Sequence, residues 1–221
     1  MADKLTHSYS SIKMFEQCPK RYLHQRINKD VVDKGSEATI YGERIHKQLE
    51  NRLALSEPLP KESAKYEEVC KVIGQVTKGA ELHLEQQLCL DENLTPTGWY
   101  DDNAWLRSIL DVLILKGDTA IIMDWKTGKR RPDFMQLELF ALQTFKHYPN
   151  IKRVKSSFIW LKEGKTDNET FTIADVNVMW TSLLSKIDKI DQSYKSNTFP
   201  ARPSGLCRYC PANKLCEYAR I

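Results

Sequence analysis

The apolar residues in the first part of the chain recur at helical spacing. One helix, which also carries His46, is predicted from apolar residues four positions apart: Ile45, Leu49 and Leu53. A second helix is predicted from one apolar face: Tyr66, Val69, Ile73, Val76 and Ala80. Two shorter helices should precede them, over residues 10–15 and from Pro19 to about residue 27, because proline is tolerated in the first turn of a helix.

The apolar pattern then changes to that of β-strands. Between residues 82 and 90 the leucines fall on alternate positions, so the opposite, polar face of this strand carries Glu85. Two further apolar runs, over 105–115 and 119–125, are separated only by a Lys-Gly-Asp turn centred on Gly117. These two runs should form a hairpin.

The second half of the chain alternates helices and strands. Asp133 can cap a helix that runs through the apolar residues up to Phe145, and two strands are expected over 154–161 and 169–173. A helix of about twenty residues should begin at Ala174. Helices that bracket a meander of strands, with a further strand after a helix, predict an α/β fold with a single domain over 1–221.

The overall composition indicates a folded protein that does not enter a membrane. The chain has 221 residues, of which 41% are hydrophobic, and this is enough to bury a core without disulfide bonds. No apolar run approaches the roughly 18 residues that span a bilayer, and the first residues lack the apolar stretch of a secretory signal. We therefore expect a cytoplasmic protein, or one in the host cytoplasm if a phage encodes it. In that reducing compartment, six cysteines favour metal binding or catalysis over disulfides.

Charge is distributed unevenly, although the formal net charge is only +4. Residues 126–165 contain ten Lys and Arg against three Asp and Glu, whereas residues 42–92 contain ten acidic residues against seven basic ones. The basic segment includes Lys129, Arg130 and Arg131, which are candidates for sequence-independent contacts with DNA phosphates. A solvated basic loop is the alternative interpretation.

The predicted hairpin brings three ionisable residues together. Asp124 and Lys126 lie two apart on one strand and share a face, and pairing across the turn places Asp111 opposite a residue within one or two positions of Asp124. In one interpretation the aspartates bind Mg2+ or Mn2+, while Lys126 orients water or neutralises charge. In the other, Asp124 and Lys126 form a salt bridge and Asp111 caps a turn.

The hairpin resembles the core of the PD-(D/E)XK nucleases, specifically of their RecB-like group, because Asp111 is followed by a strand that ends in Asp124-Trp125-Lys126. Other segments agree with motifs of that group: Ser8-Tyr9-Ser10-Ser11-Ile12, Cys18-Pro19-Lys20-Arg21-Tyr22, Gly42-Glu43-Arg44-Ile45-His46, and Gln136 as the start of a Q-x-x-x-Y motif. The resemblance implies a restriction-endonuclease-like core with a central mixed sheet flanked by helices. It also implies a Mg2+- or Mn2+-dependent deoxyribonuclease, acting as an exonuclease or an endonuclease.

The same resemblance implies roles for individual residues. The implied metal ligands are His46, Asp111, Asp124 and the carbonyl of Trp125. The implied catalytic residues are Lys126, Asp111, Asp124, Glu85 and Gln136. The chain departs from the motifs at two places, since Phe140 replaces the tyrosine of Q-x-x-x-Y and the glycine usual before the first aspartate is missing.

The cysteines fall into two classes by position. Cys207, Cys210 and Cys216 crowd the C-terminus and need a fourth ligand, for which Cys18 is the leading candidate; their spacing leaves zinc and iron–sulfur both open. The resemblance extends to RecB-like nucleases such as AddB and the CRISPR-associated spacer-acquisition exonucleases, and it implies a [4Fe-4S] cluster that closes residues 200–221 onto the N-terminal helix. The remaining two, Cys70 and Cys89, lie in apolar patterns and are predicted to be core residues.

We therefore expect a nuclease that acts on DNA, preferentially single-stranded, in DNA processing, recombination or repair. Recombination or CRISPR adaptation proteins are the expected partners. Four aromatic residues near the basic segment could stack on unpaired bases or belong to the core: Phe134, Phe140, Tyr148 and Trp160. The competing hypothesis is a non-catalytic or partner-dependent iron–sulfur subunit that binds nucleic acid.

Overall fold

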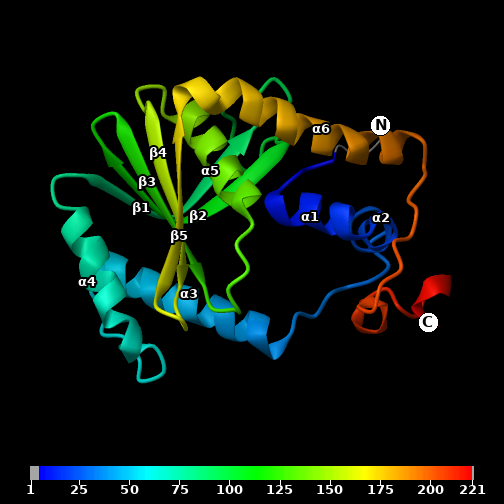
Figure 1. The fold of residues 1–221 in the computed structure, drawn as a ribbon, viewed down its shortest axis with the longest axis horizontal. Coiled ribbons are helices and arrows are strands. Elements are labelled where there is room, and N and C mark those ends of the chain that lie inside the picture. Colours follow the sequence, from blue (N-terminus) through cyan, green and yellow to red (C-terminus); the bar gives the residue numbers. More distant parts are fainter. Residues whose placement is uncertain (1–4, 221) are drawn as a thin grey trace. The chain divides into compact units, whose positions relative to one another are not determined.

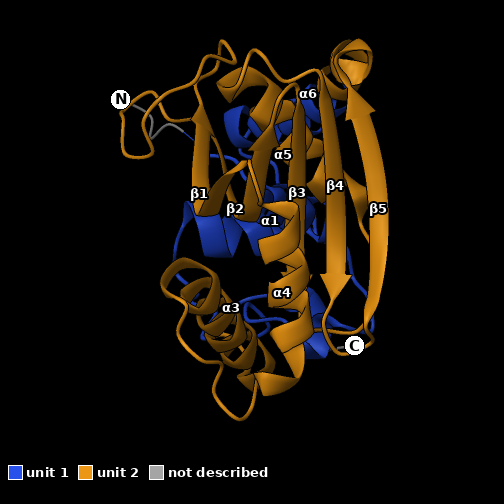
Figure 2. Cartoon of the chain, turned by 90° about the vertical axis from the view of Figure 1, so that its left-hand side faces the viewer, with its two compact units in different colours: residues 1–34, 181–221 blue, residues 35–180 orange. Residues whose placement is uncertain are grey.

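The computed structural model of the protein describes residues 5–220 and forms two compact units. One unit spans residues 35–180, and the other combines the residues before 35 with those from 181 onward (Figure 2). The expectation of a single domain over 1–221 stays a prediction. Among the described helices, none is long and apolar enough to cross a membrane.

A five-stranded mixed sheet forms the centre of the larger unit (Figure 1). Its strands are adjacent in chain order: β1 (Glu81–Leu90), β2 (Leu106–Lys116), β3 (Thr119–Lys126), β4 (Arg153–Trp160) and β5 (Lys165–Thr172). All neighbours pair antiparallel except β3 and β4, which are parallel. A parallel pair needs a crossover connection, and helix α5 (Phe134–His147) lies in the segment that joins the two strands. The α/β class with a mixed sheet flanked by helices is confirmed.

Helices α3 (Glu37–Leu55) and α4 (Glu67–Val76) pack on one face of this sheet, and the short 3-10 turn η2 (Ala64–Tyr66) precedes α4. Ser36 caps α3, because its hydroxyl accepts the N–H of Thr39. The buried residues of this layer come from both helices, from η2, from β2 and β3, and from the residue that follows β4: Ile45, Leu49, Tyr66, Cys70, Ile73, Val112, Ile114, Trp125 and Leu161. The predicted helix that carries His46 is therefore confirmed.

Helix α5 covers the other face and contacts β1, β2 and β4. Its start is capped as predicted, since Oδ1 of Asp133 accepts the N–H of Met135 at 3.2 Å. Successive side chains of a strand point to opposite faces, so β3 turns Trp125 toward α3 and turns Asp124 toward Gln136 of α5. Residues from both helix layers can therefore meet at the end of β3.

Two strands differ from their sequence predictions. The last strand begins at Lys165 rather than at residue 169, because β5 is an edge strand with mostly exposed side chains and shows no apolar alternation. In β1 the predicted strict alternation is wrong at the C-terminal end, where residues 88–90 are all buried. Cys89 lies there, and both it and Cys70 are core residues as predicted.

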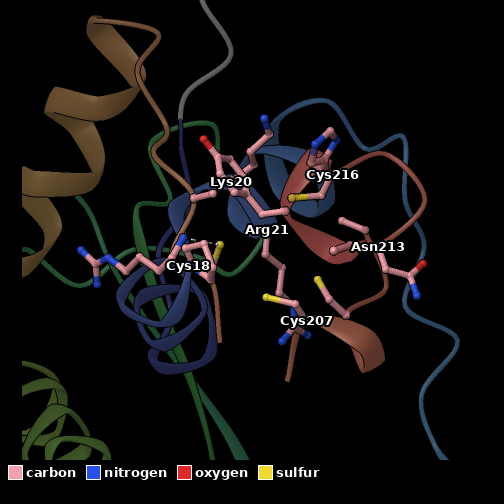
Figure 3. Close-up of a pocket in the computed structure, with 14 residues that line it drawn as sticks. Cys18, Lys20, Arg21, Cys207, Asn213 and Cys216 are labelled. Carbon is pink, nitrogen blue, oxygen red and sulfur yellow. Dashed lines mark hydrogen bonds between the residues drawn. The ribbon is translucent and has the colours of Figure 1, made fainter. Parts of the chain in front are cut away.

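The smaller unit is helical and carries the cysteine pocket. It contains α1 (Tyr9–Gln17), α2 (Pro19–Tyr22), the π-helix η1 (Leu23–Ile27), most of α6 (Val176–Lys195), and the 3-10 turns η4 (Cys207–Tyr209) and η5 (Glu217–Arg220). The helix predicted from Pro19 thus divides into an α-helical turn and a π-helix. The 3-10 turn η3 (Ile173–Asp175), in the larger unit, precedes α6. Cys18, Cys207, Cys210 and Cys216 all line one pocket (Figure 3).

Candidate active site

The site begins where the ladder between β2 and β3 ends. Its last pair is Val112 with Met123, so Asp111 and Asp124 come next on the two strands, and the predicted hairpin register is confirmed. Beyond that pair, the N–H of Trp125 donates to Oδ2 of Asp111 at 2.7 Å instead of to a backbone carbonyl. This bond holds the buried Asp111 carboxylate at the end of the ladder, between the two strands.

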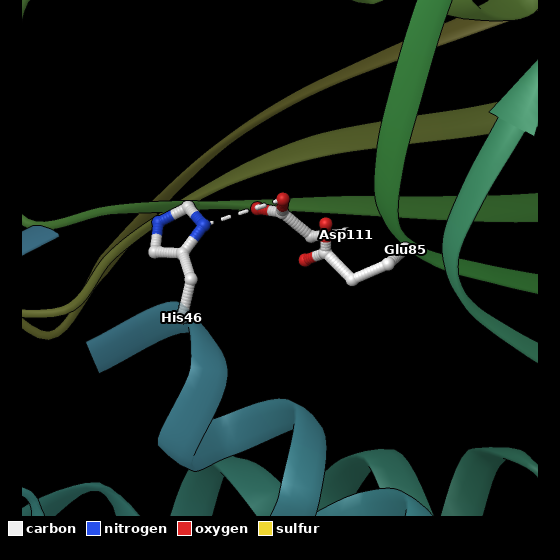
Figure 4. Close-up of side chains that lie close together, drawn as sticks. All are labelled: His46, Glu85 and Asp111. Atoms are coloured by element: carbon white, nitrogen blue, oxygen red, sulfur yellow. Dashed lines mark ion pairs between the residues drawn. The ribbon is translucent and has the colours of Figure 1, made fainter. Parts of the chain in front are cut away.

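Three potential ligands converge beside this point. The ligand atoms of His46, Glu85 and Asp111 all lie within 4.8 Å of one another (Figure 4). His46 comes from α3, its Nδ1 lies 3.3 Å from Oδ1 of Asp111, and its ring stands edge-on against that of Trp125 at 5.8 Å. Glu85 comes from β1 with a φ of 48°, a left-handed conformation that non-glycine residues rarely adopt and that costs on the order of 1 kcal/mol.

The charges in this group are poorly compensated. Burial raises the pKa of Glu85 to about 7, and the nearby charge of Asp111 adds to this effect. Burial alone would lower the pKa of His46, but its hydrogen bond to Asp111 and the surrounding carboxylates outweigh burial and raise it. A buried carboxyl that holds a proton near neutral pH beside a second carboxylate is suited to release that proton to a divalent cation.

Asp124 belongs to a second, adjoining network. Its Oδ1 accepts the side-chain N–H of Gln136 at 3.0 Å, and its Oδ2 lies 2.6 Å from Nζ of Lys126. Nζ of Lys126 also donates to Oε1 of Gln136 at 2.9 Å and lies 5.2 Å from the ring centroid of Phe158. Burial raises the pKa of Asp124, although the ammonium of Lys126 opposes the shift. The salt bridge of the second interpretation therefore exists. Ligands do gather around Asp111, as the first interpretation expects, but they are His46 and Glu85, and Asp124 is not among them.

The donor set fits a hard divalent cation. Two carboxylates and one imidazole are available in the His46 group, and Mg2+ or Mn2+ prefers oxygen ligands, with Mn2+ accepting imidazole more readily. Oδ2 of Asp124 is buried, and within the described residues it has no hydrogen bond of suitable geometry, its near neighbour being the ammonium of Lys126. A cation bound there would compete with that ammonium for this oxygen. Asp124 is, however, outside the group whose ligand atoms converge within 4.8 Å.

Comparison with known proteins decides the family. The model of the PD-(D/E)XK nuclease superfamily matches residues 6–217, which is nearly the whole chain. The chain belongs to the PD-(D/E)XK nuclease superfamily. No curated protein matches it.

One solved structure supports the fold of this superfamily member. A crystal structure from Eubacterium rectale, described as a "Putative exonuclease", is 13% identical, with a TM-score of 0.57 over 98% of this chain and 91% of the other. The crystal structure of SSO0001 is also 13% identical, over 100% and 90% of the two chains, but its TM-score is 0.43. At this identity, the first likeness supports the fold alone.

The three basic residues that follow the PD-(D/E)XK hairpin are not equivalent. Lys129, Arg130 and Arg131 are all exposed. The guanidinium of Arg130 forms a two-pronged ion pair with Asp167 of β5, with 2.8 Å from Nε to Oδ2, and its backbone N–H donates to Glu163 at 3.1 Å. Arg130 is therefore held against the edge of the sheet.

The sequence gives no sign of two residues that contact basic side chains here, Phe158 beside Lys126 and Asp167 beside Arg130. Phe158 lies under the ammonium of Lys126 because β4 runs parallel to β3 and pairs Phe158 with Asp124. Asp167 accepts the indole N–H of Trp160 at 2.7 Å as well as the Arg130 guanidinium. Both depend on the register of strands that are distant in sequence, and no local pattern signals them.

Proposed function

We propose that the protein is a metal-dependent nuclease that hydrolyses phosphodiester bonds in DNA. The observation that supports this most strongly is the His46, Glu85 and Asp111 group beside the pair formed by Asp124 and Lys126. A carboxylate-rich cation site next to a lysine suits phosphodiester hydrolysis, because the reaction needs an activated water and compensation of growing negative charge.

Each residue of the site has a distinct role in this proposal. His46, Glu85, Asp111 and Asp124, with the Trp125 carbonyl, would hold Mg2+ or Mn2+, and the cation would lower the pKa of bound water and polarise the phosphate. Lys126, fixed by Asp124 and Gln136, offers its ammonium to the phosphate oxygens. Gln136 is thus a positioning residue, since it contacts both the lysine and the carboxylate.

The proposed substrate is DNA, preferentially single-stranded, and the proposed setting is DNA processing, recombination or repair in the cytoplasm, beside recombination or CRISPR adaptation proteins. Lys129 and Arg131 are exposed next to the site and would contact phosphates without sequence preference. The exonuclease name of the Eubacterium rectale protein is in line with an action on DNA ends.

A cleavage assay tests this function. The full chain, purified without air, is incubated with labelled single- and double-stranded DNA in Mn2+, Mg2+ or EDTA. We expect cleavage in Mn2+ or Mg2+ and no cleavage in EDTA. Asp124→Ala and Lys126→Ala should each lower the cleavage rate at least about 100-fold. Lys116→Ala, an exposed lysine at the end of β2, is the matched control and should remain active. Cleavage that survives Asp124→Ala, or no cleavage by the wild type in any metal, would contradict the proposal.

We further propose that Cys18, Cys207, Cys210 and Cys216 hold a [4Fe-4S] cluster. Support comes from the pocket that all four line and from N–H donors to two of the sulfurs, Arg202 N to Cys18 Sγ at 3.5 Å and Ser204 N to Cys207 Sγ at 3.2 Å. N–H donors of this kind tune the potentials of iron–sulfur clusters.

Zinc and a cubane cluster differ in the spacing of the cysteine sulfurs that they bind. A tetrahedral zinc with bonds of about 2.3 Å would hold them about 3.8 Å apart. A cubane cluster binds each sulfur through a different iron atom and accommodates a wider arrangement.

Metal analysis tests the cluster independently of DNA cleavage. Protein purified without air should contain iron and acid-labile sulfide and show the visible absorbance of an iron–sulfur cluster. Cys210→Ser should lose both, whereas Cys70→Ala, which changes a buried cysteine outside the pocket, should keep them. Stoichiometric zinc without iron in the wild type would refute the cluster and leave the nuclease proposal standing.

A further inference from the structure

The aromatic residues near the basic segment differ sharply in exposure. Phe140 and Trp160 are only 3% and 4% exposed, so both are core residues. Tyr148 ends α5 and lies partly buried beside the rings of His83 and His147. Phe134 keeps 39% of its surface exposed and is the first residue of the same helix. Of these four, it presents the largest exposed surface for a base.

Phe134 lies next to the lysine of the site. Its ring centroid is 6.4 Å from that of Phe158, and Nζ of Lys126 lies 5.2 Å from the same Phe158 ring. Two residues further along α5, Gln136 contacts both Lys126 and Asp124. The exposed ring and the lysine of the proposed reacting centre therefore approach the same buried ring.

Two contacts restrain Phe134. Asp133 caps the helix directly before it, and its ring lies beside that of Phe158 with an interplanar angle of 42°. A side chain held in place before the ligand arrives loses little entropy on binding. An exposed phenylalanine alone is common and needs no explanation. One held beside the proposed reacting centre, and preceded by the exposed Lys129 and Arg131, combines the two elements of single-strand binding, a stacking ring and phosphate contacts.

We propose that the ring of Phe134 stacks on an unpaired base of the DNA strand whose phosphate lies at Lys126. The inference rests on the proposed nuclease function and names the structural origin of its substrate preference. In a duplex, a base can offer its face to this ring only after it has been unstacked and unpaired, which costs a few kcal/mol. The ring therefore favours single strands and frayed ends over intact duplex.

Binding measurements with three variants test the proposal. The dissociation constant of the full chain for a fluorescent single-stranded oligonucleotide is measured with Ca2+ in place of Mg2+ or Mn2+, so that binding is read without cleavage. Phe134→Leu keeps an apolar contact with Phe158 but cannot stack, and we expect about tenfold weaker binding. Phe134→Trp should bind at least as tightly as the wild type. Tyr100→Ala removes the most exposed aromatic side chain of the β1–β2 loop and should change nothing.

A double-mutant cycle identifies the base. Single abasic sites are placed at successive positions of the oligonucleotide. At one position the abasic site should weaken wild-type binding by about the same factor as Phe134→Leu, and the two changes together should cost no more than either alone. Intact duplex, measured in parallel, should bind wild type and Phe134→Leu equally.

The outcomes separate this inference from the function on which it rests. If the wild type neither binds nor cleaves DNA, the proposed function fails and the inference fails with it. If the wild type binds single strands but Phe134→Leu binds them equally well with an unchanged melting temperature, or if the abasic losses add at every position, stacking is refuted and the nuclease proposal stands. An equal loss of affinity for single strands and for duplex in Phe134→Leu would also refute stacking, since such a loss would reflect general damage to the site.

Discussion

The crowded charges of the site should make the metal-free protein lose stability as the pH rises. Burial raises the pKa of Glu85 from its ordinary value of 4.5 to about 7, and the pKa of His46 is raised as well. Both groups therefore bind a proton more tightly in the folded state than in the unfolded chain. Their stabilisation is present at low pH and is lost as the pH rises through the folded-state pKa values.

The size of this loss follows from the shift of Glu85. For a carboxyl with a pKa of about 7 when folded and 4.5 when unfolded, linkage lowers the free energy of unfolding by about 1.4 kcal/mol between about pH 6 and about pH 8. Glu85 is only half-buried, so solvent screening reduces the expected loss to about 1 kcal/mol. In a protein of this length, that corresponds to a decrease of about 2–4 °C in melting temperature. His46 adds a loss of the same sign.

Thermal unfolding in EDTA, followed by circular dichroism at several pH values, measures the effect. The informative quantity is the difference in melting temperature between the wild type and Glu85→Gln, because this difference cancels the contributions of all other titrating groups. Glu169→Gln, which changes an exposed glutamate, serves as the matched control. Mn2+ should stabilise the wild type increasingly as the pH rises, because it competes with the protons of its ligands. If the melting temperatures of the wild type and Glu85→Gln change in parallel with pH, Glu85 does not carry the raised pKa and the expected loss of stability is refuted.

Three substitutions test other parts of the site. Gln136→Leu removes the amide that joins the Lys126 ammonium to the buried Asp124 carboxylate. The value of kcat should fall about tenfold, which is the equivalent of one hydrogen bond to a charged group. An unchanged kcat would exclude a role of Gln136 in positioning Lys126. Asp167→Asn releases the guanidinium of Arg130, so DNA should bind more tightly. The slope of log Kd against log salt concentration should steepen by about one, and an unchanged slope would show that Arg130 makes no phosphate contact. Gly42→Ala places a methyl group 3.0 Å from Oγ1 of Thr127, which should cost about 1 kcal/mol of stability in thermal unfolding and be relieved in the double variant with Thr127→Ala; equal costs in both backgrounds would contradict this contact.

Local patterns were sufficient for the elements that frame the site. The four-residue spacing of Ile45, Leu49 and Leu53 places His46 on a helix, and the short turn at Gly117 pairs β2 with β3. Turn length sets the register of a hairpin, and for this reason the approach of Asp111 to Asp124 could be predicted from positions alone. The burial of the two isolated cysteines followed from their apolar surroundings.

Only the tertiary structure decided which side chains share a contact. Glu85 adopts a left-handed backbone conformation that no residue pattern indicates, and this local geometry accompanies its approach to His46 and Asp111. The pairing of Arg130 with Asp167 requires β5 to lie beside β4, and β5 is too polar for its full length to be recognised from the sequence.

The sequence by itself determined most helices and strands and the hairpin register, because these depend on spacing along a few residues. Spacing also brought Asp111 and Asp124 together, whereas the other candidate ligands were implied by the resemblance to the PD-(D/E)XK nucleases. The tertiary structure decided that Asp124 pairs with Lys126 and Gln136 while Glu85 joins His46 and Asp111. Such choices depend on how strands and helices from distant parts of the chain pack, and a difference of one residue in register turns a side chain to the opposite face.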